Sequence, residues 1–169
     1  GDINGVKVRP TFRPDRCFSE SVDKVQLEKR LDYFVSKGCK IADHGFDDFS
    51  DTQNIEWLIE KCFEKGGVLQ LHFGTFRNVN TAAFNKIGKD SGFDVFRASV
   101  DTDALARLLD KMYTKLGGLP KIILYPLHEV CLRAVCEIPG AFPNAIVGAA
   151  WWFKDTVSGI KRQLETVSE

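Results

Sequence analysis

The stretch LQLHFG at residues 69–74 has the composition of a buried β-strand, and its histidine, His72, comes just before Gly74. An amphipathic segment that closes on two glycines precedes it, over residues 52–67. Short apolar runs that alternate with longer amphipathic runs predict repeated βα units. His72 therefore stands at the carboxyl end of a strand, where a side chain can either pack in the core or take part in chemistry.

The alternation extends along the whole chain from this strand. Strands are predicted at 5–12, 39–45, 68–74, 121–127 and 143–153, and helices at 19–38, 52–67, 101–118, 129–138 and 155–167. Strands separated by helices pair in parallel through right-handed crossovers. The interiors KIILY and AIVGAA are continuously apolar, as in strands covered on both faces. We predict one α/β domain over residues 1–169, an array of about five parallel strands with flanking helices.

Local signals place the ends of these helices. Ser19 is predicted to cap the first helix, which Gly38 ends, and Asp101 or Thr102 to cap the helix that ends at a Gly-Gly pair. The segment 75–99 is turn-rich, with one or two helical turns near 81–87. It is too long for an idle connection in a compact domain, so its length indicates a functional loop.

Composition limits the class of partner. The chain has 169 residues, of which 44% are hydrophobic, enough to build a core. Acidic and basic residues number 23 each and no basic run stands out, so a nucleic-acid partner is not expected. No apolar run approaches the roughly 18 residues of a membrane span, and the N-terminus lacks a signal-peptide core. Five cysteines without a CxxC pair predict free thiols in a cytoplasmic protein. The expected partner is a small molecule.

Polar side chains stand at the carboxyl end of every predicted strand. Along the chain they are Arg13 with Asp15, Asp43 with His44, His72, Tyr125 with His128, and Trp151 with Trp152. Ligands of parallel α/β folds bind at that edge. Each residue also has a structural explanation: the histidines and tryptophans can pack, Asp15 can cap a helix, and Arg13 and Arg77 can lie in solvent. One fold rule nevertheless predicts all five positions, which favours the rim of an active site.

The residue types indicate an anionic ligand. Arginine binds a carboxylate bidentately, and histidine moves protons near neutral pH. No glycine-rich phosphate loop accompanies them, so the site suits a carboxylate or a sugar acid. A doubly wound nucleotide-binding sheet is the alternative fold, and the missing loop disfavours it.

Several segments resemble uronate isomerase, also called glucuronate isomerase, a (β/α)8-barrel family of the amidohydrolase superfamily. In family order they are FRPD (12–15), RLDYFVSKGCKIADHG (30–45), LQLHFGTFRNVN (69–80), GKDSGFD (88–94), LPKIILYPL (119–127) and WWFKDTVSGIKRQLE (151–165). The combination of H-x-G-x-x-R-N-x-N, G-x-D-x-G-F-D and a later W-W-F is specific to this family.

The resemblance implies a reaction and a set of roles. Family members interconvert D-glucuronate with D-fructuronate, and D-galacturonate with D-tagaturonate, by moving a proton between C2 and C1 near a divalent metal, commonly zinc. Catalytic roles would fall to His72, His44 and Asp43, with His72 beside metal and substrate and His44 lining the pocket with Asp43. Substrate binding would fall to Arg13, Arg77, Trp151 and Trp152.

The departures from the family pattern are equally informative. The predicted strands correspond to strands three to seven of an eight-stranded barrel, so the chain resembles a barrel fragment. The H-x-H metal ligands of strand one and the aspartate of strand eight have no counterpart, and His128 has no assured role. We therefore expect no metal bound by this chain alone, no substantial isomerase activity from it, and homo-oligomers that cover its open edges. The alternatives are a non-catalytic α/β remnant that self-associates and binds sugar acids, and a hydrolase on the same scaffold.

Overall fold

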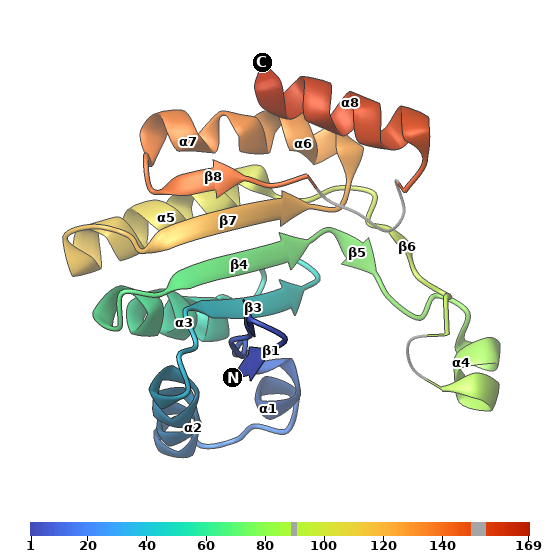
Figure 1. Ribbon diagram of the computed structural model, residues 1–169. Coiled ribbons are helices and arrows are strands. Elements are labelled where there is room, and N and C mark those ends of the chain that lie inside the picture. Colours follow the sequence, from blue (N-terminus) through green and yellow to red (C-terminus); the bar gives the residue numbers. More distant parts are fainter. Residues whose placement is uncertain (89–90, 150–154) are drawn as a thin grey trace.

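A four-stranded parallel sheet forms the centre of the molecule (Figure 1). The computed structural model describes residues 1–88, 91–149 and 155–169. The strands are β3 (Ile41–Phe46), β4 (Val68–Phe73), β7 (Lys121–Pro126) and β8 (Ala145–Val147), in the order β3-β4-β7-β8. Neighbours in the sheet thus follow chain order, as in a (β/α) barrel. The predicted α/β class and the parallel pairing are confirmed.

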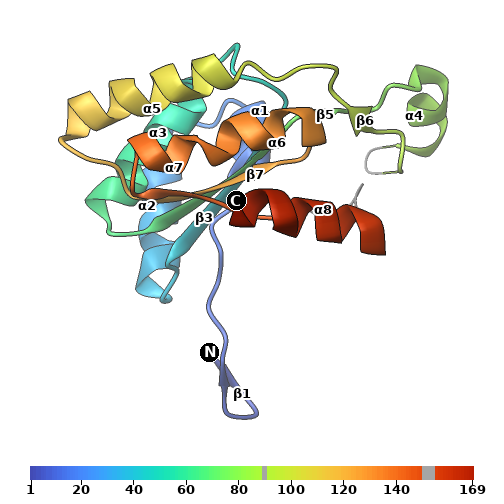
Figure 2. The ribbon, with the colours of Figure 1, turned by 90° about the horizontal axis from the view of Figure 1, so that it is seen from above.

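The prediction of a strand over 5–12 is wrong except at one residue. Asn4 and Gly5 both have positive φ, 51° and 79°, and turn the chain into an antiparallel hairpin of β1 (Asp2–Ile3) and β2 (Val6–Lys7). The hairpin projects away from the sheet (Figure 2). Pro10 then offers no N–H to a ladder. Only Phe12 pairs with β3, donating to Ile41 O and accepting from Asp43 N at 2.9 Å each.

The helix predicted over 19–38 is confirmed over residues 24–36, but a separate short helix precedes it. Helix α1 (Asp15–Ser19) ends near Ser21, whose φ is 52°, and α2 (Lys24–Ser36) starts after it. The N-cap of α2 is Asp23, which accepts from Gln26 N, so Ser19 does not cap this helix. Asp101 does cap α5 (Thr102–Leu116), accepting from Ala104 N at 2.8 Å.

The core lies between one face of the sheet and a helix layer. Figure 2 shows α3 (Gln53–Glu64), α5, α6 (Glu129–Cys136) and α7 (Ile138–Ala141) on one side of the strands. Alternate residues of a strand point to opposite faces. The residues on the helix side are fully buried, among them Leu69, Leu71, Phe73, Ile122 and Leu124. The other face carries Asp43, Gln70, Ile123 and Ile146 in one row, and Ile146 is 42% exposed.

One excursion and one terminal helix complete the fold. Between β4 and β7 the chain forms the antiparallel pair β5 (Thr75–Phe76) and β6 (Val95–Phe96) around α4 (Thr81–Ile87), which extends from the body (Figure 1). The helical turns predicted near 81–87 are confirmed. Helix α8 (Val157–Ser168) packs beside α6. None of the helices in the described part of the chain has the length and apolar character that a membrane crossing needs.

Candidate functional site

Asp43 joins two cationic or polar partners at the carboxyl ends of β3 and β4. One of its carboxylate oxygens accepts from His72 Nε2 at 2.9 Å, and the other accepts from Arg13 Nη1 at 2.9 Å. Asp43 and His72 lie on the same face of the sheet, because Gly45 is the register partner of His72. His72 is buried, with 5% of its surface exposed. The structure thus brings together three of the predicted site residues, Arg13, Asp43 and His72.

His44 lies on the opposite face of β3. As the residue after Asp43 in an extended strand it points into the helix layer, where its ring packs edge-on against Phe18 at 5.1 Å. Its Nδ1 donates to Asp15 Oδ1 at 2.5 Å. The structure therefore does not place His44 beside Asp43, and His44 is absent from the lining of the cleft described below.

Asp15 connects the two sides of the strand. Its second oxygen accepts from Arg13 Nε at 2.8 Å, which completes a continuous chain of five side chains, His44–Asp15–Arg13–Asp43–His72. Burial acts to raise the pKa of Asp15, but the hydrogen bonds and charges of His44 and Arg13 outweigh it and lower the pKa. Burial acts to lower the pKa of Arg13, but Asp15 and Asp43 outweigh it and raise the pKa. Both groups are therefore charged at neutral pH.

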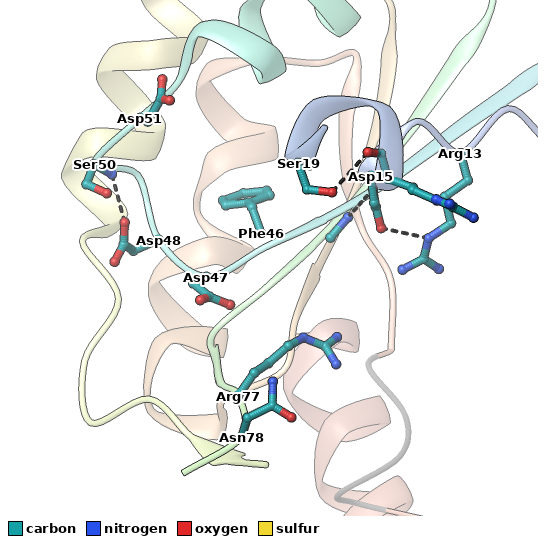
Figure 3. A pocket seen from close by; sticks show the side chains of 12 residues that line it. Arg13, Asp15, Ser19, Phe46, Asp47, Asp48, Ser50, Asp51, Arg77 and Asn78 are labelled. Atoms are coloured by element: carbon teal, nitrogen blue, oxygen red, sulfur yellow. Dashed lines mark hydrogen bonds and ion pairs between the residues drawn. The ribbon is translucent and has the colours of Figure 1, made fainter. Parts of the chain in front are cut away.

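A cleft of about 690 Å³ opens beside these hydrogen-bonded side chains (Figure 3). Arg13 and Asp15 line one side, and Arg77, from the segment after β5, points toward them from the other. Arg77 is oriented by Asp94, which accepts from Arg77 Nη1 at 3.2 Å and from Asn78 N at 2.8 Å. Two guanidinium groups from distant parts of the sequence thus line one cavity, whose lining also includes Asp47, Asp48 and Asp51.

Gly45 forms the wall between the cleft and His72. A Cβ atom at this position would lie 2.7 Å from His72 Cε1 and 2.9 Å from Nδ1. The imidazole is thus packed directly against the β3 backbone, which is possible only because residue 45 has no side chain. Neither His72 nor Asp43 lines the cleft itself. Arg13, which is bonded to Asp43, and Gly45, which contacts His72, lie between the pair and the cleft.

The remaining strand-end residues have different positions. Trp151 and Trp152 lie outside the described residues. His128 caps α6 by accepting from Val130 N at 3.1 Å, and the hydroxyl of Tyr125 accepts from Gln70 at 3.2 Å. Sequence reasoning missed the contributions of Gly45 and Asp94. For Asp94 a signal existed, because it is the last residue of the quoted G-x-D-x-G-F-D segment.

The site does not hold a complete set of metal ligands within the part of the chain that the structure describes. No group of three His, Cys, Asp or Glu side chains there could bind a metal ion. His72 Nε2 and both oxygens of Asp43 are already used in the chain of hydrogen bonds. A catalytic zinc usually takes three protein ligands. The described residues therefore do not fit a metal on their own.

A parallel sheet in chain order, with helices on one face and polar groups at its carboxyl edge, defines part of a (β/α)-barrel protein. Comparison with known proteins gives the family. The sequence model of the glucuronate isomerase family matches residues 48–169, so the chain belongs to the glucuronate isomerase family.

Individual relatives agree with this assignment. Uronate isomerases of Bacteroides fragilis, Caldanaerobacter subterraneus and Staphylococcus haemolyticus are 28%, 30% and 32% identical, each over 96% of this chain and 47% of its own length. The crystal structure of a Thermotoga maritima uronate isomerase superposes with a TM-score of 0.81 at 24% identity, over 98% of this chain and 48% of that one. A glucuronate isomerase from Caulobacter crescentus gives 0.68 at 27% identity, over 82% and 35%.

The match covers only part of each relative. The chain spans about half the length of the curated relatives it matches. The alignment with the Bacteroides fragilis protein is 223 positions long, whereas this chain has 169 residues. That relative therefore carries inserted residues within the matched part.

Proposed function

We propose that this chain provides the uronate-binding and proton-transfer part of an aldose–ketose isomerase site that acts on D-glucuronate or D-galacturonate. The observation that carries the proposal is the Arg13–Asp43–His72 chain at the carboxyl ends of β3 and β4, with Arg77 across the same cleft. Family membership supports the reaction, and the two arginines support an acidic sugar as its substrate.

The groups suit the proton transfers that the reaction needs. Converting an aldose to a ketose moves a proton from C2 to C1 and the hydroxyl proton of O2 to O1, through an enediol. A carboxylate hydrogen-bonded to an imidazole can take up a proton and return it, so Asp43 and His72 are the proposed pair for this step. Arg13 and Arg77 would bind the sugar's carboxylate and fix the carbon chain beside them. Trp151 or Trp152 is proposed as a wall of the pocket, on the resemblance alone.

A divalent metal, commonly zinc, belongs to the activity that the resemblance implies. Since the described residues do not supply its ligands, we propose that this chain by itself binds uronate without isomerising it at a substantial rate. The alternative function that we propose is that of a non-catalytic domain that recognises sugar acids.

The test is to measure binding and turnover separately on the 169-residue protein. We expect calorimetry to detect D-glucuronate but not D-glucose, which lacks the carboxylate. Arg77→Gln should weaken binding roughly ten- to hundredfold, since a charge-assisted hydrogen bond contributes about 1.5–3 kcal/mol. Arg77→Lys, which keeps the charge, should lose less. Arg107→Gln, on the exposed side of α5, is the matched control and should bind like the parent protein.

Three results would contradict the proposal. Equal binding of glucose and glucuronate would remove the role of the two arginines. An unchanged affinity in Arg77→Gln would place the carboxylate elsewhere. Robust zinc-dependent conversion of D-glucuronate to D-fructuronate by the 169-residue protein would refute the expectation that it is inactive alone.

We also propose that the chain self-associates through its uncovered apolar surface. Ile146 on the open face of the sheet is 42% exposed, and Val157, Ile160 and Leu164 on α8 are 88%, 46% and 55% exposed. An i, i+3, i+7 stripe of apolar residues is the pattern of a helix face that packs against another element. A second copy of the chain is the proposed cover, because burying this surface removes apolar area from water.

A reducing compartment, the cytoplasm, is proposed from the cysteines. All five are free thiols, and Cys39, Cys62 and Cys131 are buried. Burial raises the pKa of the Cys62 thiol to about 12, which makes it unreactive.

A further inference from the structure

We infer that Asp15 and His44 are positioning residues for Arg13: they hold its guanidinium in one orientation at the cleft, with His44 acting from the opposite face of β3. The consequence for uronate affinity rests on the proposed function. The hydrogen bonds that position Arg13 do not depend on the proposed function, so the positioning of Arg13 and the binding of uronate can be tested separately.

Two carboxylates fix the plane of the Arg13 guanidinium. Nε donates to Asp15 Oδ2 at 2.8 Å and Nη1 donates to Asp43 Oδ2 at 2.9 Å. The guanidinium is planar and its five N–H groups point in fixed directions. Bonds from two of its nitrogens to two separate carboxylates therefore leave it no free rotation. Nη2 is left on the side of Gly45, 3.6 Å from the place a Cβ would take, where it faces the cleft wall.

Without an anchor, this arrangement would be weak. The Arg13 side chain is 49% exposed and that of Asp15 is 32% exposed. An exposed ion pair of this kind adds little to stability and does not hold a single geometry. Something rigid must fix the Asp15 carboxylate if Arg13 is to keep its place.

His44 has the properties of such an anchor. Its side chain is 9% exposed, and its ring lies between Phe18 on α1 and Phe46 on its own strand, with ring centroids 5.1 Å and 6.0 Å away. Nδ1 donates to Asp15 Oδ1, and the backbone N–H of Gly45 approaches the same oxygen at 3.4 Å. The buried imidazole of His44 thus orients the carboxylate of Asp15, and this carboxylate orients the guanidinium of Arg13. In the same way, a third group orients the base in the arrangements that activate nucleophiles.

A positioning role for His44 predicts different results from a catalytic role. His44 points into the helix layer, on the face of β3 opposite to Asp43 and His72, so it is not placed to touch a substrate bound against that pair. Its loss should loosen Arg13 and reduce affinity for a carboxylate. It should leave any neutral ligand unaffected.

The experiment measures the Arg13 side chain directly by NMR. In ¹⁵N-arginine-labelled protein the Nε–H signal of Arg13 is identified by its disappearance in Arg13→Lys. We expect slow exchange of this proton with water in the parent protein. Exchange should become at least tenfold faster in Asp15→Ala and in His44→Leu. His44→Asn, whose amide can donate in place of Nδ1, should restore slow exchange. Glu20→Gln, at the exposed end of α1, is the matched control and should match the parent.

Binding of D-glucuronate is the second measurement on the same variants. Affinity should fall three- to tenfold in His44→Leu and recover in His44→Asn. If His44→Leu does not fold, Asp15→Asn, which keeps the shape of the side chain, carries the same expectation for the Arg13 proton. Unchanged Arg13 exchange in the folded His44→Leu or Asp15→Asn protein would overturn the inference, as would failure of His44→Asn to restore it. Failure of the parent to bind uronate, with the exchange results as expected, would remove the proposed function and leave the positioning chain standing.

Discussion

Gly45→Ala is the most direct test of how tightly the site is built. The new methyl group would lie 2.7 Å and 2.9 Å from two ring atoms of His72, closer than non-bonded carbon atoms approach. The ring cannot simply turn away, because His72 is 5% exposed and its Nε2 is bonded to Asp43. Either the imidazole or strand β3 must move by several tenths of an ångström.

The magnitude follows from three contributions. Overpacking a filled site costs about 2 kcal/mol, and weakening the His72–Asp43 hydrogen bond costs about 1 kcal/mol more. Replacing glycine by alanine returns about 0.7 kcal/mol by restricting the unfolded chain. The net expectation is a loss of about 2 kcal/mol in the free energy of unfolding, which for a chain of this size lowers Tm by roughly 4–8 °C.

Urea unfolding of four proteins would measure it: the parent, Gly45→Ala, His72→Ala and the double variant. In the His72→Ala background the methyl group has no ring to meet, so Gly45→Ala should cost nothing or stabilise slightly. Gly140→Ala, where a Cβ meets nothing within 4 Å, is the control and should not destabilise. An equal cost of Gly45→Ala with and without the imidazole would refute the reasoning.

Three further expectations follow from other parts of the molecule. The pKa of Asp15 lies below its ordinary value of 3.8. The difference in free energy of unfolding between the parent and Asp15→Asn should therefore be constant above about pH 5 and shrink as the pH falls below 3.8. A difference that grows toward low pH would contradict this. Light scattering should show self-association that Ile146→Glu reduces and Val25→Glu, on exposed α2, does not; a monodisperse parent monomer that binds no apolar dye would count against the uncovered-surface proposal. At pH 8 a thiol reagent should modify half-buried Cys17 in the folded protein but reach Cys62 only after unfolding, and fast labelling of Cys62 would show that the core opens locally.

The strands that could be predicted are those whose apolar runs fill the core. Residues 68–74 and 121–127 became β4 and β7 because Leu69, Leu71, Ile122 and Leu124 are buried against the helix layer. The segment 5–12 failed because the Asn4–Gly5 turn signal outweighed its β-rich composition and Pro10 interrupted the ladder.

The site was predictable in its location and less so in its connections. Strand-end placement found Arg13, Asp43 and His72, which meet in the structure. The period of two in a strand already implies that Asp43 and His44 face opposite ways. The bond from His44 to Asp15 could not be predicted, because it depends on how α1 folds back over the end of β3, a tertiary arrangement with no local sequence signal.

The excursion that carries Arg77 also affects how the sheet can assemble. Ile41 pairs with Val68, 27 residues further on, and Ile122 with Ala145, 23 residues further on, whereas Val68 pairs with Lys121, 53 residues further on. Doubling the length of a closed loop costs about 0.6 kcal/mol of chain entropy. We therefore expect the β4–β7 pairing to close more slowly in folding than the β3–β4 and β7–β8 pairings.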